Sequence, residues 1–305
     1  MKTMQAIVDH ALTLTPALLV VAVAHDEPVL EAVVQATQAG FVTPYLIGDQ
    51  HAIEAILKQH SWDLDAHIVD EKDAAEACRL AVTKVYETPG ALLMKGLVDT
   101  SVLLKAALVK EKGLRTSRRI SHVSVFEVAQ YPRILMMSDG AMNIAPTVDE
   151  KQDIIENAVE IAHALGLENP YVGLIAAVEK VNPKMPATLD AQTLIERQKA
   201  GAMPGCVLEG PYAIDNAVDV EAAKHKGIEA PGAGRSDILI MPYIEAGNVF
   251  YKTLMFLAGA KSASVIAGAL KPIVLTSRAD SSESKYYSIA LAACVAAKHT
   301  EIKGA

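Results

Sequence analysis

The chain has 305 residues, of which 51% are hydrophobic, 21% are charged and 5% are aromatic, and its formal net charge is −8. This composition excludes an intrinsically disordered chain and is typical of a folded protein with roughly two domains. The negative charge argues against a nucleic-acid-binding protein, which normally presents a strong positive field.

The cysteines and the N-terminus bear on the cellular compartment. Cys78, Cys206 and Cys294 are far apart and form no CxxC pair, which favours a reducing compartment over a disulfide framework. Residues 1–10 contain an acid and no long apolar run, so we expect no signal peptide. The apolar run at 17–24 is much shorter than the roughly 20 residues that span a bilayer. These features predict a cytoplasmic protein.

The first block of the chain alternates short apolar runs with helical patterns. Its predicted strands are 17–24, 41–47, 66–69 and 91–94, and its predicted helices are 27–38, 50–59, 72–86 and 100–110. Pro28 in the first turn and Gly40 just past the end mark the limits of the first helix. The charged stretch 110–119 follows, and on composition it is the best candidate for a crossing into a second domain.

The second block opens with two apolar runs, 121–128 and 133–137, which we expect to pair as an antiparallel hairpin. Thr147 and Glu150 match a capping box, in which two side chains satisfy exposed N–H groups at a helix start. Further predicted strands are 172–178, 205–208, 238–241 and 271–275, and the last predicted helix is 284–298. Because strands and helices alternate, the sequence predicts an α/β fold whose mostly parallel sheet has helices on both faces.

The common cofactor and hydrolase motifs are missing. The sequence contains no GxGxxG, no GxxxxGK(S/T), no HExxH and no GxSxG. The nine histidines are scattered without metal-ligand spacing, and no cysteine has a neighbouring histidine that would activate it. We therefore expect no tightly bound cofactor, no metal site and no thiol nucleophile.

One polar segment, 275–285, follows a predicted strand and opens a helix. The carboxyl edge of a parallel sheet is where such folds bind ligands, so this turn is a candidate site. Arg278 could clamp a phosphate with two hydrogen bonds, and Ser277 and Ser281 could add further donors. The alternative is that the serines only cap the helix and that Arg278 pairs with Asp280.

A second polar segment, 237–248, ends a predicted strand in a turn before another helix. Gly247 would allow a ligand to approach the backbone closely, and Asn248 could orient it. Ordinary turn chemistry with an N-cap is the simpler interpretation. Lys105 lies in the predicted helix at 100–110 and could reach an anion, although most helical lysines are solvated.

The order of these motifs resembles the phosphate acetyl/butyryltransferase family. The run 237–252 is similar to the family's strand, polar turn and Gly-Asn-x-x-Tyr-Lys helix start, and 270–278 resembles its Lys-Pro segment running into Ser-Arg. Residues 139–143, with the sequence Asp-Gly-Ala-Met-Asn, and the Glu-Gly segment at 208–210 match two more family segments. The likeness covers nearly the whole chain, and motifs in matching order are more specific than any one alone.

The resemblance implies two α/β/α domains with mostly parallel sheets and an interdomain cleft, similar to the isocitrate and isopropylmalate dehydrogenase fold. The first domain would combine residues 1–117 and 266–305, and the second would comprise 118–265. It also implies a homodimer that exchanges an acyl group between coenzyme A and inorganic phosphate, with coenzyme A as a substrate. Both substrates are anions, so their site must be locally positive within an acidic protein.

Carried over residue by residue, the resemblance makes Ser277 and Arg278 the family's catalytic pair. The acetyl-specific members have a proposed base, an aspartate seven residues after the serine, where this chain has Ser284. Glu283 and Asp280 are the nearest carboxylates, and Glu283 ranks slightly ahead as a base. The departures from the acetyl-specific pattern, which are Ser284 in place of the aspartate and Lys105 in place of an arginine, look more like the butyryl branch of the family. The expected substrate-binding residues are Lys105, which replaces a family arginine, with Gly247, Asn248, Asp280, Ser281 and Ser284.

The resemblance favours direct transfer in a ternary complex, in which butyryl-CoA and phosphate give butyryl phosphate and CoA. Holding both substrates in attack geometry supplies much of the rate without a covalent intermediate. Two alternatives stay open on sequence alone. A metal- and NAD-dependent dehydrogenase on the related fold would need clustered aspartates, and a regulatory module could bind CoA esters without turnover. Acyl chain length is also open, because one methylene changes binding by only about 1–3 kcal/mol.

Overall fold

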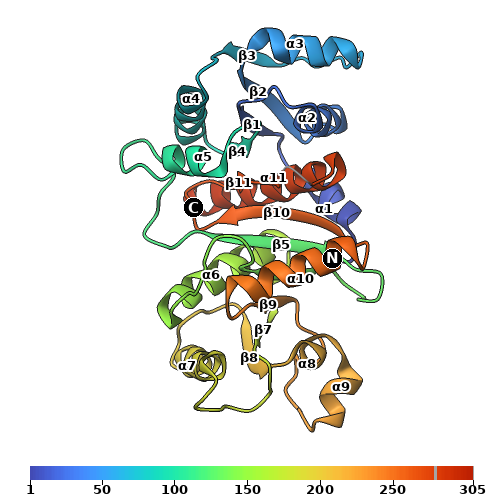
Figure 1. Ribbon diagram of the computed structural model, residues 1–305, viewed down its shortest axis with the longest axis vertical. Coiled ribbons are helices and arrows are strands. Elements are labelled where there is room, and N and C mark those ends of the chain that lie inside the picture. The colour runs from blue at the N-terminus through green and yellow to red at the C-terminus, as the bar shows by residue number, and fades with distance from the viewer. Residues whose placement is uncertain (278–279, 305) are drawn as a thin grey trace. The chain divides into compact units, whose positions relative to one another are not determined.

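The computed structural model describes residues 1–277 and 280–304, which form two compact units. The discontinuous unit contains residues 5–117 and 263–305, and the middle unit contains residues 1–4 and 118–262 (Figure 1). The domain limits predicted from the sequence, at 117/118 and 265/266, lie close to these positions. That each unit is an independently folding domain stays a prediction.

The sheet of the discontinuous unit is mostly parallel. Its strands are β1 (Ala17–Ala22), β2 (Val42–Gly48), β3 (His67–Asp70), β4 (Leu92–Lys95), β10 (Lys261–Ala267) and β11 (Ile273–Val274). They lie in the order β3-β2-β1-β4-β11-β10, and only the β10–β11 pair among them is antiparallel in the described residues. Leu19, Val20 and Val21 in the central strand β1 are fully buried, as expected where helices cover both faces.

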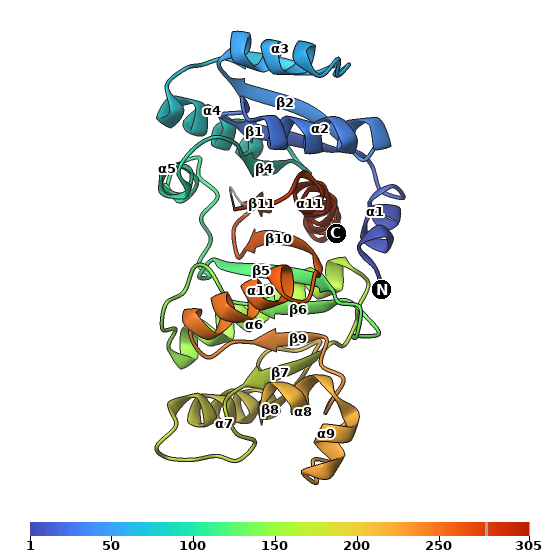
Figure 2. The ribbon, with the colours of Figure 1, turned by 45° about the vertical axis from the view of Figure 1, so that its right-hand side comes forward.

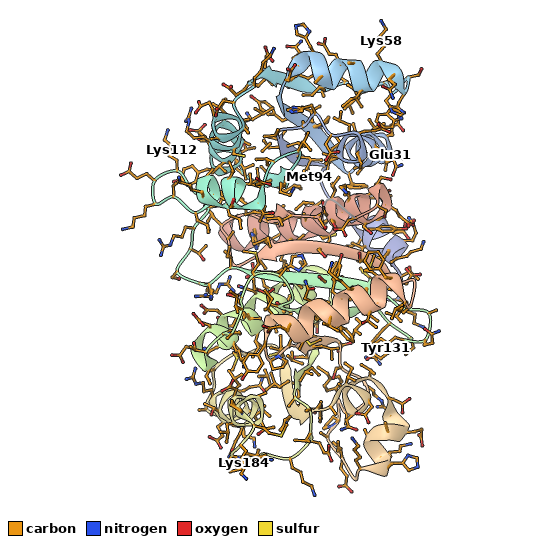
Figure 3. All side chains as sticks on the ribbon, viewed as in Figure 1. Glu31, Lys58, Met94, Lys112, Tyr131 and Lys184 are labelled. Atoms are coloured by element: carbon orange, nitrogen blue, oxygen red, sulfur yellow. The ribbon has the colours of Figure 1, made fainter. Side chains whose placement is uncertain are left out.

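Helices cover both faces of this sheet. They are α1 (Met4–Ala11), α2 (Glu27–Ala39), α3 (Gln50–Gln59), α4 (Ala74–Glu87), α5 (Thr100–Ala107) and α11 (Ser282–Gly304). Helix α11 packs against α2, and α4 packs against α5, with the two pairs on opposite faces (Figure 2). Met94 of β4 points into this layered interior, whereas Lys58 and Lys112 point away from it (Figure 3).

The middle unit contains five strands. Its strands are β5 (Ser121–Glu127), β6 (Leu135–Ser138), β7 (Tyr171–Ile175), β8 (Val207–Tyr212) and β9 (Ile238–Ile240), in the order β5-β6-β9-β7-β8. Strands β5 and β6 are antiparallel, and the pairs from β6 onward are parallel. Its helices are α6 (Val148–Ala164), α7 (Pro186–Lys199), α8 (Ile214–Val218), α9 (Val220–His225) and α10 (Ile244–Phe256).

Local sequence signals predicted several of these elements correctly. Strands β5 and β6 form the expected antiparallel pair. The capping box at the start of α6 is present, because Thr147 Oγ1 accepts the Glu150 N–H and Glu150 Oε2 accepts the Thr147 N–H at 2.8 Å. Gly40 ends α2 with a φ of 95°, a left-handed conformation that favours glycine.

Other predictions were wrong. Strand β10 was not predicted, and the strand expected at 271–275 shrinks to the two residues of β11. Gly247 and Asn248 do not form a turn, because α10 begins at Ile244 and includes both residues. Tyr243, rather than Asn248, is the residue that precedes this helix.

Gly247 makes a close backbone approach, but to the protein itself rather than to an open ligand site. A Cβ added at this position would lie 2.7 Å from Gly140 Cα and closer still to the Asp139 carbonyl oxygen. Asn248 Nδ2 donates a hydrogen bond to the Gly140 carbonyl at 3.2 Å. The first turns of α10 therefore rest directly on the turn that follows β6.

We expect Gly247→Ala to destabilise the protein by about 1–3 kcal/mol, because the added methyl group meets backbone that cannot move freely. An unhindered Gly→Ala change in a helix would instead stabilise by roughly 0.5–1 kcal/mol. Chemical denaturation measures the difference. Asn248→Ala, which removes one partly buried hydrogen bond, serves as the control and should cost less. A stabilised Gly247→Ala variant would show that the contact is absent.

The three cysteines are free thiols with little access to reagents. Cys78 and Cys294 are buried, and Cys206 is half-buried. Burial raises the pKa of Cys78 and of Cys206 to about 11, and it raises the pKa of Cys294 to about 12. Because the thiolate is the reactive form, these side chains are poor nucleophiles at neutral pH.

In a disulfide-exchange assay at about pH 8, the native protein should therefore release chromophore very slowly. Unfolding in guanidinium should expose all three thiols at once. Any slow native reaction should be traced to Cys206, the most accessible of the three, and should disappear in Cys206→Ser. Rapid labelling of the native Cys206→Ser variant would contradict the burial of Cys78 and Cys294.

Candidate active site

The carboxyl ends of three parallel strands lie side by side in the discontinuous unit. Strand β4 pairs in parallel with β1 on one side and with β11 on the other. The chain leaves β1 toward β2 and β3 and then returns to β4 on the other side of β1. This reversal creates a topological switch point, where open α/β sheets bind ligands. The segments that follow these strands, 23–26, 96–99 and 275–281, begin at this edge.

Ser277 and Asp280 form a turn directly after β11. The Ser277 N–H donates to Asp280 Oδ2 at 2.7 Å, and the Asp280 N–H donates back to the Ser277 carbonyl at 3.1 Å. The Ser277 side chain is exposed. Arg278, the other predicted catalytic residue, lies outside the described residues, so its expected pairing with Asp280 is not tested. Asp280 thus shapes the turn that presents Ser277.

The predicted site residues at the start of α11 have defined local partners. Ser281 Oγ accepts the Ser284 N–H at 3.1 Å, which is the helix-capping role that the sequence left as an alternative. Ser284, at the position of the family's aspartate, is buried and accepts the Ser288 hydroxyl through its carbonyl oxygen at 2.7 Å. Glu283 is exposed and accepts the Tyr287 hydroxyl at 3.2 Å, one turn along the helix.

Two lysines at this edge are buried, and the sequence analysis singled out neither. Lys95 ends β4, and its Nζ donates to the carbonyl oxygens of Gly96 and Val98 at 3.2 and 3.1 Å. Lys285 is 3% exposed, and its Nζ donates to the Asp280 carbonyl at 2.5 Å. Burial lowers the pKa of Lys285, while the Asp280 and Asp26 carboxylates act in the opposite direction.

Lys105, by contrast, was predicted to bind substrate and lies apart from this turn. It occupies the last turn of α5 with an exposed side chain. Within residues 1–277 and 280–301, no hydrogen bond or ion pair links it to the Ser277 turn. The buried positive charge at this sheet edge therefore comes from Lys95 and Lys285 rather than from Lys105.

A second cluster surrounds the turn after β6 in the middle unit. The Asp139 side chain is 3% exposed, and its Oδ1 accepts the N–H groups of Ala141 and Met142 at 2.8 and 3.0 Å. Its Oδ2 accepts Asn143 Nδ2 at 2.6 Å. These bonds fold residues 139–143 into a fixed turn, on which Gly247 and Asn248 rest.

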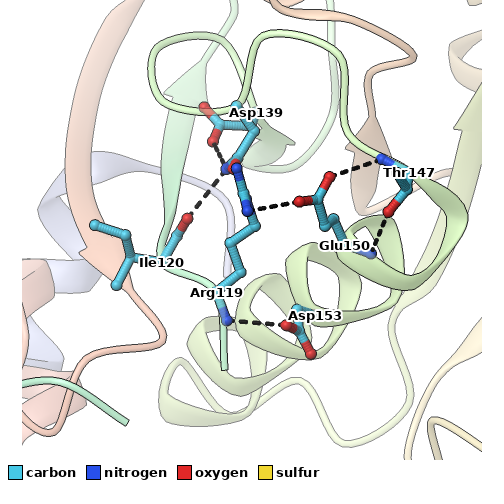
Figure 4. A network of polar contacts seen from close by, with 7 residues as sticks. Arg119, Ile120, Asp139, Thr147, Glu150 and Asp153 are labelled. Atoms are coloured by element: carbon cyan, nitrogen blue, oxygen red, sulfur yellow. Dashed lines mark hydrogen bonds and ion pairs between the residues drawn. The ribbon is translucent and has the colours of Figure 1, made fainter. Parts of the chain in front are cut away.

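Arg119 joins this turn to helix α6 (Figure 4). Its Nε donates to Asn143 Oδ1, and its Nη1 lies 2.6 Å from Glu150 Oε1. Its backbone N–H donates to Asp153 Oδ2 at 2.9 Å. The sequence analysis placed Arg119 at the end of the charged stretch 110–119, whereas in the structure it braces the Asp139 turn. This role could not be predicted from the residues next to Arg119, because its partners Asn143 and Glu150 are distant in the sequence.

Two features are absent from the described part of the chain. Within residues 1–277 and 280–301, no group of three or more His, Cys, Asp or Glu side chains is arranged to hold a metal ion. None of the described helices combines the length and the apolar character needed to cross a bilayer.

Solved structures of phosphotransacylases share this fold. A branched-chain phosphotransacylase from Enterococcus faecalis V583 matches with a TM-score of 0.81 and 32% identity, over 92% of this chain and 99% of that one. A phosphotransacetylase from Staphylococcus aureus matches with a TM-score of 0.80 over 97% and 100% of the two chains, but at 18% identity it shows the fold alone. The predicted α/β fold with a mostly parallel sheet is confirmed.

Sequence comparison gives the family. The family model described as "Phosphate acetyl/butaryl transferase" matches residues 71–293. A phosphate butyryltransferase from Clostridium acetobutylicum is 48% identical over 90% of this chain and 92% of its own length. A phosphate acetyltransferase from Thermotoga maritima is 46% identical over 91% and 95% of the two chains. The chain therefore belongs to the phosphate acetyl/butyryltransferase family and is a phosphate acyltransferase, which exchanges an acyl group between coenzyme A and phosphate.

Proposed function

We propose that this enzyme transfers a butyryl group, converting butyryl-CoA and phosphate into butyryl phosphate and CoA in a single ternary complex. The observation that carries the proposal is the turn after β11, where Ser277 is exposed and held by Asp280 at the carboxyl edge of the sheet. The similarity to a butyryltransferase supports the choice of acyl group. An acetyltransferase is almost as similar, so chain length needs a direct measurement.

In this mechanism, a phosphate oxygen attacks the thioester carbonyl carbon and forms the new C–O bond. The C–S bond then breaks, and CoA leaves as a thiolate that takes up the proton released from phosphate. Arg278 holds the phosphate by two charged hydrogen bonds, and the Ser277 hydroxyl donates to the developing oxyanion or to sulfur. Both residues act by orientation and charge stabilisation, so no covalent enzyme intermediate is required.

Proton transfer in this reaction requires only a weak general base. In the reverse direction the CoA thiol must ionise, and a free thiol has a pKa of about 8.5, so a modest perturbation suffices. Ser284 cannot supply a carboxylate, and Asp280 already binds the Ser277 N–H. We therefore assign the base role to Glu283, which is exposed and would exchange its bond with Tyr287 for one with the substrate.

Some of the predicted substrate-binding residues are placed to contact substrate directly, and others act through the local structure that they form. Lys105 and Asn248 are exposed, which supports direct contact with an anionic or polar substrate group. Ser281 and Ser284 act through the helix start that they form. Gly247 is buried against Gly140, so its contribution runs through the turn that it contacts. The three free cysteines support a cytoplasmic location.

Phosphate-dependent release of CoA from acetyl-, propionyl-, butyryl- and valeryl-CoA tests this function. We expect release to require phosphate and to be fastest with the butyryl ester. Arg278→Ala should reduce turnover by roughly 100-fold or more, because the phosphate loses its clamp. Arg79→Ala, which removes an exposed arginine paired with Glu76, is the matched control and should keep wild-type activity.

Two results would count against the proposal. Normal turnover in Arg278→Ala would remove the assignment of the phosphate clamp. A maximum with acetyl-CoA would place the enzyme with the acetyltransferases instead. If CoA esters raised the melting temperature without any release, the chain would bind its ligand without catalysis.

We also propose that the enzyme is a homodimer and that α10 forms the interface. Among residues 244–256 only Gly247 is buried, although this helix is rich in apolar residues. Val249 is 65% exposed, Phe256 is 70% exposed, and the next residue, Leu257, is 84% exposed. Val249 and Phe256 are seven residues apart, so they share one face of the helix. An apolar helix face of this kind supports packing against the same face of a second copy.

Replacing Phe256 with Glu should place a charge in this interface and convert dimers into monomers. Sedimentation velocity at micromolar concentration measures the change. Val181→Glu, at an exposed apolar residue of the middle unit outside α10, is the control and should leave the dimer intact. A monomeric wild-type protein, or a Phe256→Glu variant that stays dimeric, would rule out this interface.

A further inference from the structure

Lys285 combines charge and burial beside the candidate active site. It lies in the first turn of α11, eight residues after Ser277, and its side chain is only 3% exposed. Lysine is almost never buried to this degree unless its ammonium group has partners, because removing the charge from water is costly. The cost of burying the ammonium group of Lys285 must therefore be offset by contacts with neighbouring residues.

The hydrogen-bond partner of Lys285 lies in the turn after β11, at the carboxyl edge of the sheet. Its Nζ donates to the Asp280 carbonyl at 2.5 Å, which fixes the backbone of the turn after β11. The carboxylates of Asp280 and Asp26 both stabilise its charged form. Asp26 follows β1 and stands at the N-cap position of α2, yet its side chain makes no capping hydrogen bond there.

Lys285 and Ser277 are linked through Asp280. The ammonium of Lys285 holds the Asp280 carbonyl, and the Asp280 carboxylate accepts the Ser277 N–H at 2.7 Å. The buried lysine at the start of α11 is therefore joined to the turn that carries Ser277.

We propose that Lys285 is a positioning residue for acyl transfer, holding the Asp280 backbone in the Ser277–Asp280 turn and so fixing the orientation of the Ser277 hydroxyl. This inference rests on the proposed role of Ser277. It concerns orientation rather than binding strength, because Lys285 is buried and acts through Asp280. Loss of the ammonium group should lower kcat and leave the KM for acyl-CoA nearly unchanged.

Kinetics and backbone amide exchange together test the proposal on the full-length enzyme. In Lys285→Met we expect kcat to fall roughly 10- to 100-fold, since small displacements of a reacting group cost about this much. The KM for butyryl-CoA should stay within about threefold, because loss of orientation alone lowers kcat. Lys285→Arg keeps the charge and should recover part of kcat. Lys298→Met, on the exposed side of the same helix, is the control and should match the wild type in every measurement.

Amide hydrogen exchange supplies a readout that does not depend on activity. The amides of Ser277 and Asp280 are both hydrogen-bonded within the turn, so they report its integrity. Peptides covering 275–284 should exchange at least several-fold faster in Lys285→Met and unchanged in Lys298→Met. Lys285→Arg keeps the charge, and it should show the same two effects more weakly. It also serves as the test if Lys285→Met does not fold.

The outcomes separate this inference from the proposed function. If the wild type releases no CoA, the proposed function fails, and exchange in the 275–284 peptides still decides whether Lys285 holds the turn. If the wild type is active and Lys285→Met keeps both kcat and slow exchange, the positioning role is wrong. A fall in melting temperature with unchanged kcat would also overturn it, because the lysine would then serve stability alone.

Discussion

The parallel pairing of β4 with β11 is the constraint on which the candidate site depends. It joins residues 92–95 to a two-residue strand from near the other end of the chain, with Ile273 opposite Leu93. The Leu93 N–H also donates to the Pro272 carbonyl at 3.1 Å, which extends the register by one step. Because a slip of one residue would turn every side chain to the opposite face, this short pairing fixes where the Ser277 turn emerges.

The position of the Ser277 turn at the carboxyl edge of the sheet also determines which charged side chains surround the candidate site. The protein is acidic overall, yet both of its family's substrates are anions. Lys95 and Lys285 are buried at the carboxyl edge, where their ammonium groups donate to backbone carbonyls rather than lying in solvent. A charge held in a low-dielectric environment acts more strongly on a nearby anion than a surface charge does. A small number of buried lysines can thus offset the unfavourable net charge locally.

Features that depend on neighbours in sequence were predictable, and features that depend on distant neighbours were not. The capping box at Thr147 and the helix end at Gly40 follow from residues within one turn. Strand β10 was missed because its buried Ser262 and Ser264 interrupt the apolar pattern. The burial of Lys285 is a property of the tertiary packing, and the role of Gly247 depends on a turn more than 100 residues earlier. Of the predicted catalytic pair, Ser277 directly follows β11 and its role stays a prediction, while Arg278 lies outside the described residues.

The division of one unit between the two ends of the chain also has a consequence for synthesis. The middle unit is nearly continuous, so almost all of its residues have left the ribosome before β10 and β11 are made. The discontinuous unit must wait, because β4 has no partner on one side until residue 274 emerges. Until then, its unpaired edge is open to other chains. Closing a loop of this length slows folding, although it adds little to the equilibrium cost. The same late step that completes the sheet also creates the turn that carries Ser277, so a nascent chain gains its candidate site only when its fold is complete.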